Sequence, residues 1–304
     1  MPRIVSLLPA ATEIVWALGA GHSLVGISHE CDYPEQVREL PKLTRPRRRA
    51  DDSGQWTGID AEGLVSQGLG FYEVDAARLR ELRPDVIITQ THCDICAATE
   101  ADLAAALDEW LGTRPEIVSL DGRDLAAIWD DIVEVGAVLG RPDEAAALIS
   151  RIETRMASIA ARTEPVWEEP RVAVLEWMSP LMVAGNWVPD IVQRAGCRSV
   201  LTTAGAHSPP ISIRTLVGID PDVIVVAPCG YSLAQTLDEA PTLAAIDGWE
   251  ELNAVWDARV FLTDGSQFFN RPGPRLAEAV EIIADIVHGA GRRGASRGKH
   301  WIRI

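Results

Sequence analysis

The sequence lacks long apolar runs and carries little positive charge. No stretch approaches the roughly 20 consecutive apolar residues of a membrane-spanning helix, so we expect no membrane insertion. Of the 304 residues, 28 are Lys or Arg and 44 are Asp or Glu, which gives a formal net charge of −16. Proteins that bind nucleic acids need clustered positive charge to contact the phosphates, so the composition argues against such a partner.

Recognised catalytic motifs are also missing. The segment GAGHSLVG, residues 19–26, follows a predicted helix instead of opening one, so it lacks the position of a phosphate-binding loop. The sequence contains no Walker motif, no G-x-S-x-G nucleophile elbow and no H-E-x-x-H zinc motif. Carboxylates are numerous, but no spacing pairs them for acid–base chemistry. We therefore expect a protein that is not an enzyme.

The first residues bear on the location of the protein. The predicted strand RIVSLL begins at Arg3, which leaves no room for the basic, apolar and cleavage segments of a secretory leader. We therefore expect a cytoplasmic protein. In a reducing compartment its five cysteines are expected to be thiols rather than disulfides.

Continuous apolar runs alternate with helical patterns along the chain. Such runs are typical of parallel strands that are covered on both faces. The predicted strands are 3–8, 23–28, 84–90, 116–120, 171–177, 221–228 and 259–264. A long helix is predicted from Pro142 to Thr163, and at ~1.5 Å per residue it is long enough to run along a whole lobe. The last clear helix begins near Pro274 and ends at about His288.

These patterns predict the α/β fold class and two lobes. A single hydrophobic core stops growing at roughly 250–300 residues, so a chain of this length is expected to form more than one. We place an N-terminal α/β lobe at residues 1–121 and a linking helical segment, which includes the long helix, at 122–165. A C-terminal α/β lobe follows at 166–290, and a loose basic tail at 291–304.

A short internal repeat links the two lobes. The segment 79–97, LRELRPDVIITQTHCDICA, aligns with 216–234, LVGIDPDVIVVAPCGYSLA, from Pro84 to Pro221. Each copy contains Pro-Asp, an apolar strand and a loop with cysteine, which predicts two similar lobes. Ligands bind outside the carboxyl ends of parallel strands, where both loops begin. We therefore expect both loops to line one ligand cleft between the lobes.

Four of the five cysteines follow predicted strands. Cys31 lies in SHECDYP, Cys93 and Cys96 lie in THCDICA, and Cys229 lies in APCGY. Cysteine is among the most buried residue types, so burial as a small apolar residue is the alternative for each of them. Four thiolates around one cleft would suit zinc or an iron–sulfur cluster. Cys93 and Cys96 are also spaced like a redox pair.

Aromatic and basic side chains in loops form the second candidate set. Large ligands are held by apolar and aromatic walls with a few polar anchors, and ordinary packing is the alternative for each residue. Arg271 lies shortly before a predicted helix start, a position that attracts anionic groups. The predicted ligand-binding residues are Tyr33, Trp177, Trp187, Tyr231, Phe269 and Arg271.

Several separated segments resemble one family. The match opens with RIVSLLPAATEIVWALGAGHSLVGISHECDYP and continues through LRPDVIITQTHCDICA, LEWMSPLMVAGNWVP, PDVIVVAPCG and RPGPRL. Together they resemble the cobalamin-binding branch of the class III periplasmic-binding proteins. The resemblance implies two Rossmann-like α/β lobes joined by one long backbone helix, with the ligand in the cleft between them, as in the substrate-binding proteins of ABC transporters. The cysteine-containing loops resemble those of a subgroup that looks cytoplasmic.

The sequence leaves three functions open. The resemblance implies a non-enzymatic protein that binds cobalamin or another corrinoid. The first alternative is a protein that binds zinc or an iron–sulfur cluster through Cys31, Cys93, Cys96 and Cys229. The second alternative is a thiol-redox enzyme that uses Cys93 and Cys96. In the first two functions the partner is a small molecule or a metal ion.

Overall fold

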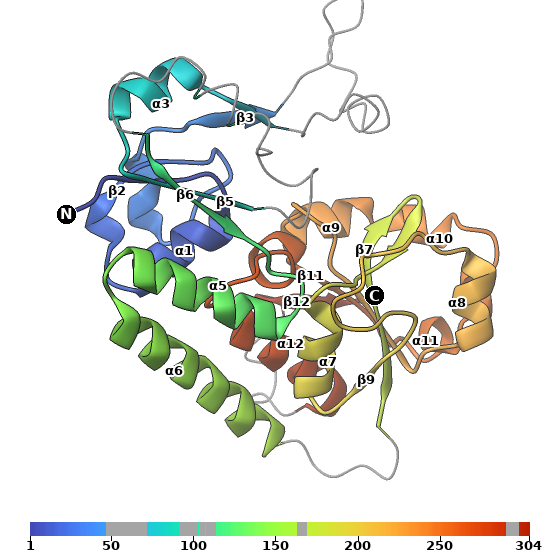
Figure 1. Cartoon of the computed structure of the whole chain (residues 1–304). Coiled ribbons are helices and arrows are strands. Elements are labelled where there is room, and N and C mark those ends of the chain that lie inside the picture. Colours follow the sequence, from blue (N-terminus) through green and yellow to red (C-terminus); the bar gives the residue numbers. More distant parts are fainter. Residues whose placement is uncertain (47–71, 91–102, 104–106, 108–113, 163–168, 290–297) are drawn as a thin grey trace, which may run out of the picture. The chain divides into compact units, whose positions relative to one another are not determined.

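The computed structural model describes residues 1–46, 72–90, 103, 107, 114–162, 169–289 and 298–304 (Figure 1). The chain forms two compact units. Unit 1 comprises residues 1–121 and 127–148, and unit 2 comprises residues 122–126 and 149–304. The long helix α6 (Pro142–Ala160) contributes residues to each unit.

Unit 1 is built on a four-stranded parallel sheet with the strand order β2-β1-β5-β6. Each of its strands is an apolar run that the sequence predicts. The strands are β1 (Ile4–Ser6), β2 (Leu24–Ile27), β5 (Val86–Gln90) and β6 (Glu116–Leu120). The other elements are α1 (Pro9–Ala17), the 3-10 helices η1 (Gly21–Ser23) and η2 (Glu35–Glu39), the antiparallel pair β3 (Thr44–Pro46) and β4 (Tyr72–Val74), α3 (Ala76–Leu82) and most of α5 (Leu125–Val138).

Unit 2 is built on a mixed sheet with the order β12-β11-β10-β7-β8, to which β9 adds by pairing with β7. Strands β7, β10 and β11 are parallel, whereas β8 and β12 run antiparallel to their neighbours. The strands are β7 (Arg171–Met178), β8 (Leu181–Val183), β9 (Arg198–Ser199), β10 (Val223–Val226), β11 (Val260–Thr263) and β12 (Trp301–Arg303). The helices are α7 (Val188–Arg194), α8 (Ile213–Ile219), α9 (Leu233–Glu239), α10 (Pro241–Ala244), η3 (Trp249–Glu251), α11 (Asn253–Trp256), η4 (Gly265–Phe269) and α12 (Leu276–His288).

In each unit, strand residues pack against helix residues in an apolar core. Val5 and Ile87 pack with Leu79 of α3 in unit 1, and Leu175 packs in a cluster with Leu216 of α8 in unit 2. Every residue of β1, β5, β10 and β11 is buried, which is why these strands read as continuous apolar runs. The predicted α/β fold class is confirmed. No helix within the described ranges combines the length and the apolar character that a membrane crossing demands.

The chain end differs from the expected loose basic tail. Trp301 and its two neighbours form β12, which pairs antiparallel with β11. The Trp301 indole is buried, its Nε1 donates to Oδ2 of Asp285 at 2.9 Å, and its ring meets the ring of Phe261 edge to face. These apolar and hydrogen-bonding contacts of one residue outweigh the basic character of the segment. Residues 290–297 lie outside the described residues.

A reciprocal contact ties the first residues of two neighbouring strands in unit 1. The backbone N–H of Arg3, just before β1, donates to Oδ2 of Asp85, just before β5, at 2.7 Å. The backbone N–H of Asp85 donates in turn to the carbonyl of Arg3 at 2.8 Å. Nε of Arg3 also donates to the carbonyl of Leu82, the last residue of α3, at 2.8 Å. One arginine therefore binds both the neighbouring strand and the end of the preceding helix.

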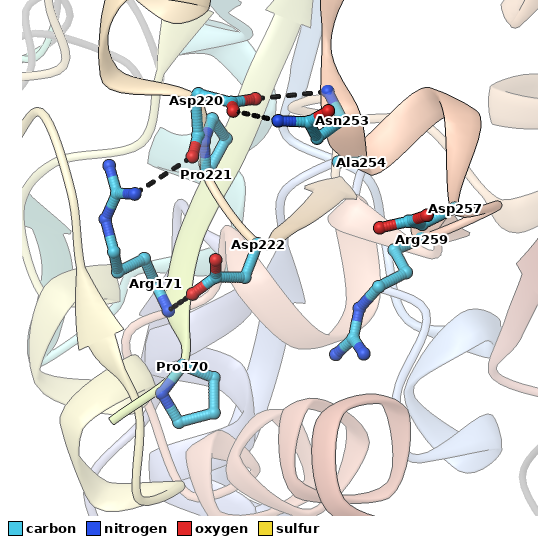
Figure 2. Close-up of a pocket in the computed structure, with 9 residues that line it drawn as sticks. All are labelled: Pro170, Arg171, Asp220, Pro221, Asp222, Asn253, Ala254, Asp257 and Arg259. Carbon is cyan, nitrogen blue, oxygen red and sulfur yellow. Dashed lines mark hydrogen bonds between the residues drawn. The ribbon is translucent and has the colours of Figure 1, made fainter. Parts of the chain in front are cut away.

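Unit 2 repeats this arrangement at the start of β7 and β10. The backbone N–H of Arg171 donates to Oδ2 of Asp222 at 2.7 Å, and the N–H of Asp222 donates to the carbonyl of Arg171 at 2.9 Å (Figure 2). The Arg171 guanidinium donates to the carbonyls of Ile219 and Asp220 at the end of α8. We call this arrangement, present in each unit, the Arg–Asp clamp. It is the structural counterpart of the internal Pro-Asp repeat.

Removing the clamp carboxylate is expected to destabilise either unit. We expect Asp85→Ala and Asp222→Ala each to lower the free energy of unfolding by about 1–3 kcal/mol, because a backbone N–H loses a charged acceptor. Urea unfolding measures the change. Asp247→Ala is the matched control, because Asp247 is an exposed aspartate of unit 2. Clamp variants that unfold at the same urea concentration as this control would contradict the stabilising role.

Candidate functional site

The loop after β2 is held against β3 and β4 by hydrogen bonds. The hydroxyl of Thr44 lies 2.8 Å from Oγ of Ser28, accepts from the backbone N–H of His29 at 3.0 Å, and lies 2.7 Å from Nδ1 of that residue. Tyr72 donates its hydroxyl to Oε1 of Glu30 at 2.7 Å, and its ring meets the His29 ring edge to face. These contacts order the chain at the carboxyl end of β2, where the sequence predicts ligand-binding and metal-binding residues.

The predicted metal ligand Cys31 is buried in this loop. The residue is 2% exposed, and its thiol lies 3.0 Å from the hydroxyl of Thr12, which also lies 2.8 Å from Oγ of Ser6. The ammonium group of Lys42 donates to the carbonyl of Cys31 at 2.9 Å. The predicted ligand-binding residue Tyr33 differs, because 46% of it is exposed. Tyr33 therefore presents its side chain at the surface of unit 1, and Cys31 does not.

The proposed four-thiol site cannot be assembled from the described residues. Cys93 and Cys96 lie outside them, Cys31 belongs to unit 1 and Cys229 to unit 2. Among the residues that the structure describes, no group of three or more His, Cys, Asp or Glu side chains is placed to hold a metal ion. The metal site, like the redox pair, stays a prediction from the sequence.

In unit 2 the ends of β7 and β10 bring two predicted aromatic residues together. The rings of Trp177 and Tyr231 meet edge to face with their centroids 5.4 Å apart, and Nε1 of Trp177 donates to the carbonyl of Ser179 at 3.0 Å. Cys229 is exposed, and its backbone N–H donates to the carbonyl of Glu176 at 3.1 Å. We call Glu176, Trp177, Cys229 and Tyr231 the carboxyl-end surface of unit 2.

The loop after β11 packs closely against the loop that carries Tyr231. The backbone N–H of Ser266 donates to the carbonyl of Tyr231 at 3.0 Å. A Cβ atom at Gly265 would lie 2.1 Å from the carbonyl oxygen of Pro228, so only glycine permits this approach. The loop after β11 is therefore in direct contact with the loop after β10, and this contact holds the Tyr231 segment in one position.

Glu176 is a polar group of this surface that the sequence analysis did not predict. It directly precedes Trp177, and its side chain is half-buried. Burial raises the pKa of the Glu176 carboxyl, and a hydrogen bond from Ser208 opposes that rise. The signal that could have found it is a carboxylate within the apolar run VAVLEW, because charged residues are rarely buried without a reason.

The other three predicted ligand-binding residues lie in the interior of unit 2. Trp187 is 5% exposed and Phe269 is 1% exposed, and Nε1 of Trp187 donates to the carbonyl of Phe269 at 2.9 Å. Arg271 is also buried, with Nη2 3.4 Å from the hydroxyl of Ser266. These contacts tie Trp187 to the segment after β11 and hold that segment in the interior, whereas Trp177 and Tyr231 contact each other at the strand ends.

Two α/β units with aromatic and polar loops at the carboxyl ends of their strands form the architecture of a two-lobed solute-binding protein. Residues 4–266 match the family described as "Periplasmic binding protein". The chain belongs to this family. Membership confirms the prediction of a non-enzymatic protein that binds a solute.

Relatives of known name are similar over most of the chain. The "Uncharacterized ABC transporter substrate-binding lipoprotein YvrC" of Bacillus subtilis is 23% identical over 296 residues, which cover 94% of this chain and 80% of that protein. The "Vitamin B12-binding protein" of Vibrio vulnificus is 23% identical over 288 residues, which cover 93% and 89%. The crystal structure of a periplasmic heme-binding protein from Pseudomonas aeruginosa shares the fold, with a TM-score of 0.71, 22% identity and coverage of 95% and 94%.

The prediction of a cytoplasmic location is wrong. One relative is a substrate-binding lipoprotein of an ABC transporter and another is a periplasmic binding protein, so proteins of this kind work outside the cytoplasm. A predicted strand at the start of a sequence does not by itself establish location. The reducing environment expected for the five cysteines no longer follows from location.

The close approach at Gly265 predicts a large effect of one methyl group. We expect Gly265→Ala to lower the free energy of unfolding by about 1–3 kcal/mol, because the loops after β10 and β11 must separate. Gly218→Ala is the matched control: Gly218 lies within α8, and a Cβ there would meet no described atom within 4 Å. Helix propensity predicts that this control stabilises the protein by about 0.5–1 kcal/mol. Thermal unfolding that shows equal effects of both variants would contradict the close contact.

The raised pKa of Glu176 predicts a stability difference that depends on pH. Because the pKa in the folded protein lies above that of the unfolded chain, ionised Glu176 opposes folding at neutral pH. We expect Glu176→Gln to increase stability at pH 7, and this advantage to vanish as pH falls below the unfolded value of about 4.3. Urea midpoints across this pH range test it, with Glu250→Gln at an exposed site of unit 2 as the control for removing one charge. A variant less stable than the parent at pH 7 would show that the charge contributes to stability instead.

Proposed function

We propose that this protein binds a corrinoid of the cobalamin class and delivers it to an ABC transporter. Family membership supports the role of a solute carrier. The name of the similar Vibrio vulnificus protein supports the ligand class, and that of the Bacillus subtilis lipoprotein supports the transporter.

The observation that carries the proposal is the aromatic pair on the carboxyl-end surface of unit 2. A corrinoid has a broad ring system with apolar edges and polar amide side chains. Trp177 and Tyr231 offer aromatic surface, and their edge-to-face contact keeps each ring in a defined orientation. The half-buried carboxyl of Glu176 offers a hydrogen-bond partner for an amide. Aromatic walls with few polar anchors are the composition of a site for a large organic ligand.

In this proposal unit 1 also contributes an aromatic side chain to ligand binding. Tyr33 is the exposed residue of the loop after β2, and the contacts of Thr44 and Tyr72 order that loop before any ligand binds. A prearranged loop loses less conformational entropy on binding than a free one. Trp187, Phe269 and Arg271 then act through the packing of unit 2, not through contact with the ligand.

Titration with cobalamin tests the proposal. We expect cyanocobalamin to quench tryptophan fluorescence in a saturable way, because Trp177 would lie against the ring. We expect Trp177→Ala to weaken binding by about tenfold or more, as removal of a large aromatic contact does at binding sites. Trp256→Ala is the matched control, because Trp256 is 77% exposed on α11, at the other end of the unit 2 strands.

A parallel titration with hemin separates the ligand classes. Saturable binding of cyanocobalamin that is lost in Trp177→Ala and kept in Trp256→Ala would agree with the proposal. Binding of hemin without binding of cobalamin would overturn the corrinoid assignment. Equal loss of affinity in both tryptophan variants would overturn the assignment of the site.

A further inference from the structure

The amino ends of the unit 2 strands line a hollow of 510 Å³ (Figure 2). It lies where β7, β10 and β11 begin, whereas the carboxyl-end surface lies where β7 and β10 end. The hollow is therefore distinct from the proposed corrinoid site. Its polar lining residues are Arg171, Asp220, Asp222, Asn253, Asp257 and Arg259.

Four of these six side chains, those of Arg171, Asp220, Asp222 and Asn253, are already engaged in structural contacts. The guanidinium of Arg171 closes the end of α8 as part of the Arg–Asp clamp. Oδ1 of Asp220 accepts from the backbone N–H of Asn253 at 3.1 Å, and Oδ2 accepts from Nδ2 of the same residue. Figure 2 shows both contacts on the upper wall of the hollow. These groups shape the hollow, but their bonding capacity is largely occupied.

Two opposite charges of the lining are not engaged in this way. Nε of Arg259 is buried and has no hydrogen-bond partner among the described residues. The carboxylate of Asp257 likewise forms no hydrogen bond or ion pair within the described ranges, and Figure 2 shows the Arg259 side chain extending away from it. A buried, unbonded guanidinium nitrogen is costly, and a carboxylate ligand is its best partner because the planar donors match two oxygens.

The charges of the lining residues determine which charged groups the ligand must carry besides a carboxylate. Three aspartates and two arginines give an excess of one negative charge, so a simple anion that approaches Arg259 also meets repulsion. A simple cation that approaches Asp257 meets the uncompensated Arg259. A molecule with a carboxylate and an ammonium group satisfies both at once. We propose that this hollow binds a small zwitterion of the amino-acid class, with its carboxylate on Arg259 and its ammonium on Asp257.

Matched probes distinguish a zwitterion from a single charge. Glycine, β-alanine and γ-aminobutyrate carry both charges at increasing separation. Acetate, propanoate and butanoate carry the anion alone, and methylamine, ethylamine and propylamine carry the cation alone. Binding to the full, isotopically labelled chain is followed through the backbone amide NMR signals of Asn253 and Ala254 beside the hollow. The amide of Tyr231 reports on the carboxyl-end surface in the same spectra.

The expected result is a clear preference within this set. At least one amino acid should bind about tenfold more tightly than its singly charged relatives, because it makes one more charge-assisted contact. Arg259→Gln and Asp257→Asn should each remove that preference. Arg214→Gln is the matched control, because Arg214 is exposed on α8 and is not part of the lining. Circular dichroism of each variant verifies that it is folded.

Three outcomes would overturn the inference: no signal change with any amino acid, equal binding of a simple carboxylate, or unchanged binding in folded Arg259→Gln. A response at Tyr231 without one at Asn253 would also do so, because the ligand would then occupy the carboxyl-end surface. The cobalamin titration does not depend on these results. Failure of either proposal can therefore be recognised separately.

Discussion

The Arg–Asp clamp is the contact on which the order of each sheet depends. A carboxylate just before one strand accepts the backbone N–H at the start of its neighbour, and the returned N–H···O bond makes the contact reciprocal. Two such bonds leave no freedom to slip by one residue, which would reverse the face of every side chain. The side chain of the same arginine binds the end of the helix that precedes the aspartate, so the two clamp residues together align that helix end with two strands.

The pairing of two strands at their amino ends determines which of their residues lie side by side at the carboxyl ends. In unit 2, Arg171 opposite Asp222 aligns β7 with β10 so that Leu175 pairs with Val226. Trp177 follows shortly after Leu175 in β7, Tyr231 lies in the loop after β10, and their rings meet. Gly265 then allows the loop after β11 to hold the Tyr231 segment from the other side. The aromatic surface is thus a consequence of sheet alignment and of one residue without a side chain.

The sequence predicted the fold better than the site, for a physical reason. Strands such as β5 and β10 bury every residue and therefore read as continuous apolar runs. The run at 171–177 matched β7 within one residue, and 116–120 matched the bounds of β6, although the first two residues of β6 are exposed. The Pro-Asp repeat predicted similar lobes because the clamp requires aspartate at that position. The strand β12 was missed because its stability comes from distant contacts of Trp301 with Asp285 and Phe261. The sequence gives no signal for the burial of an aromatic residue near the end of a strand or helix, so Trp177 at the end of β7 and the buried Trp187 just before α7 could not be distinguished.

Burial also distinguishes the cysteines of the described residues from one another. Cys31 is enclosed beside the hydroxyl of Thr12, and burial raises the pKa of the Cys197 thiol to about 12, so neither has the exposure that reactive thiols need. Cys229 is exposed in the loop after β10, which the internal repeat aligns in sequence with the segment that contains Cys93 and Cys96. Outside the cytoplasm an exposed thiol is open to oxidation. Of the cysteines in the described part of the chain, Cys229 is therefore the one whose chemistry a ligand on the carboxyl-end surface would change.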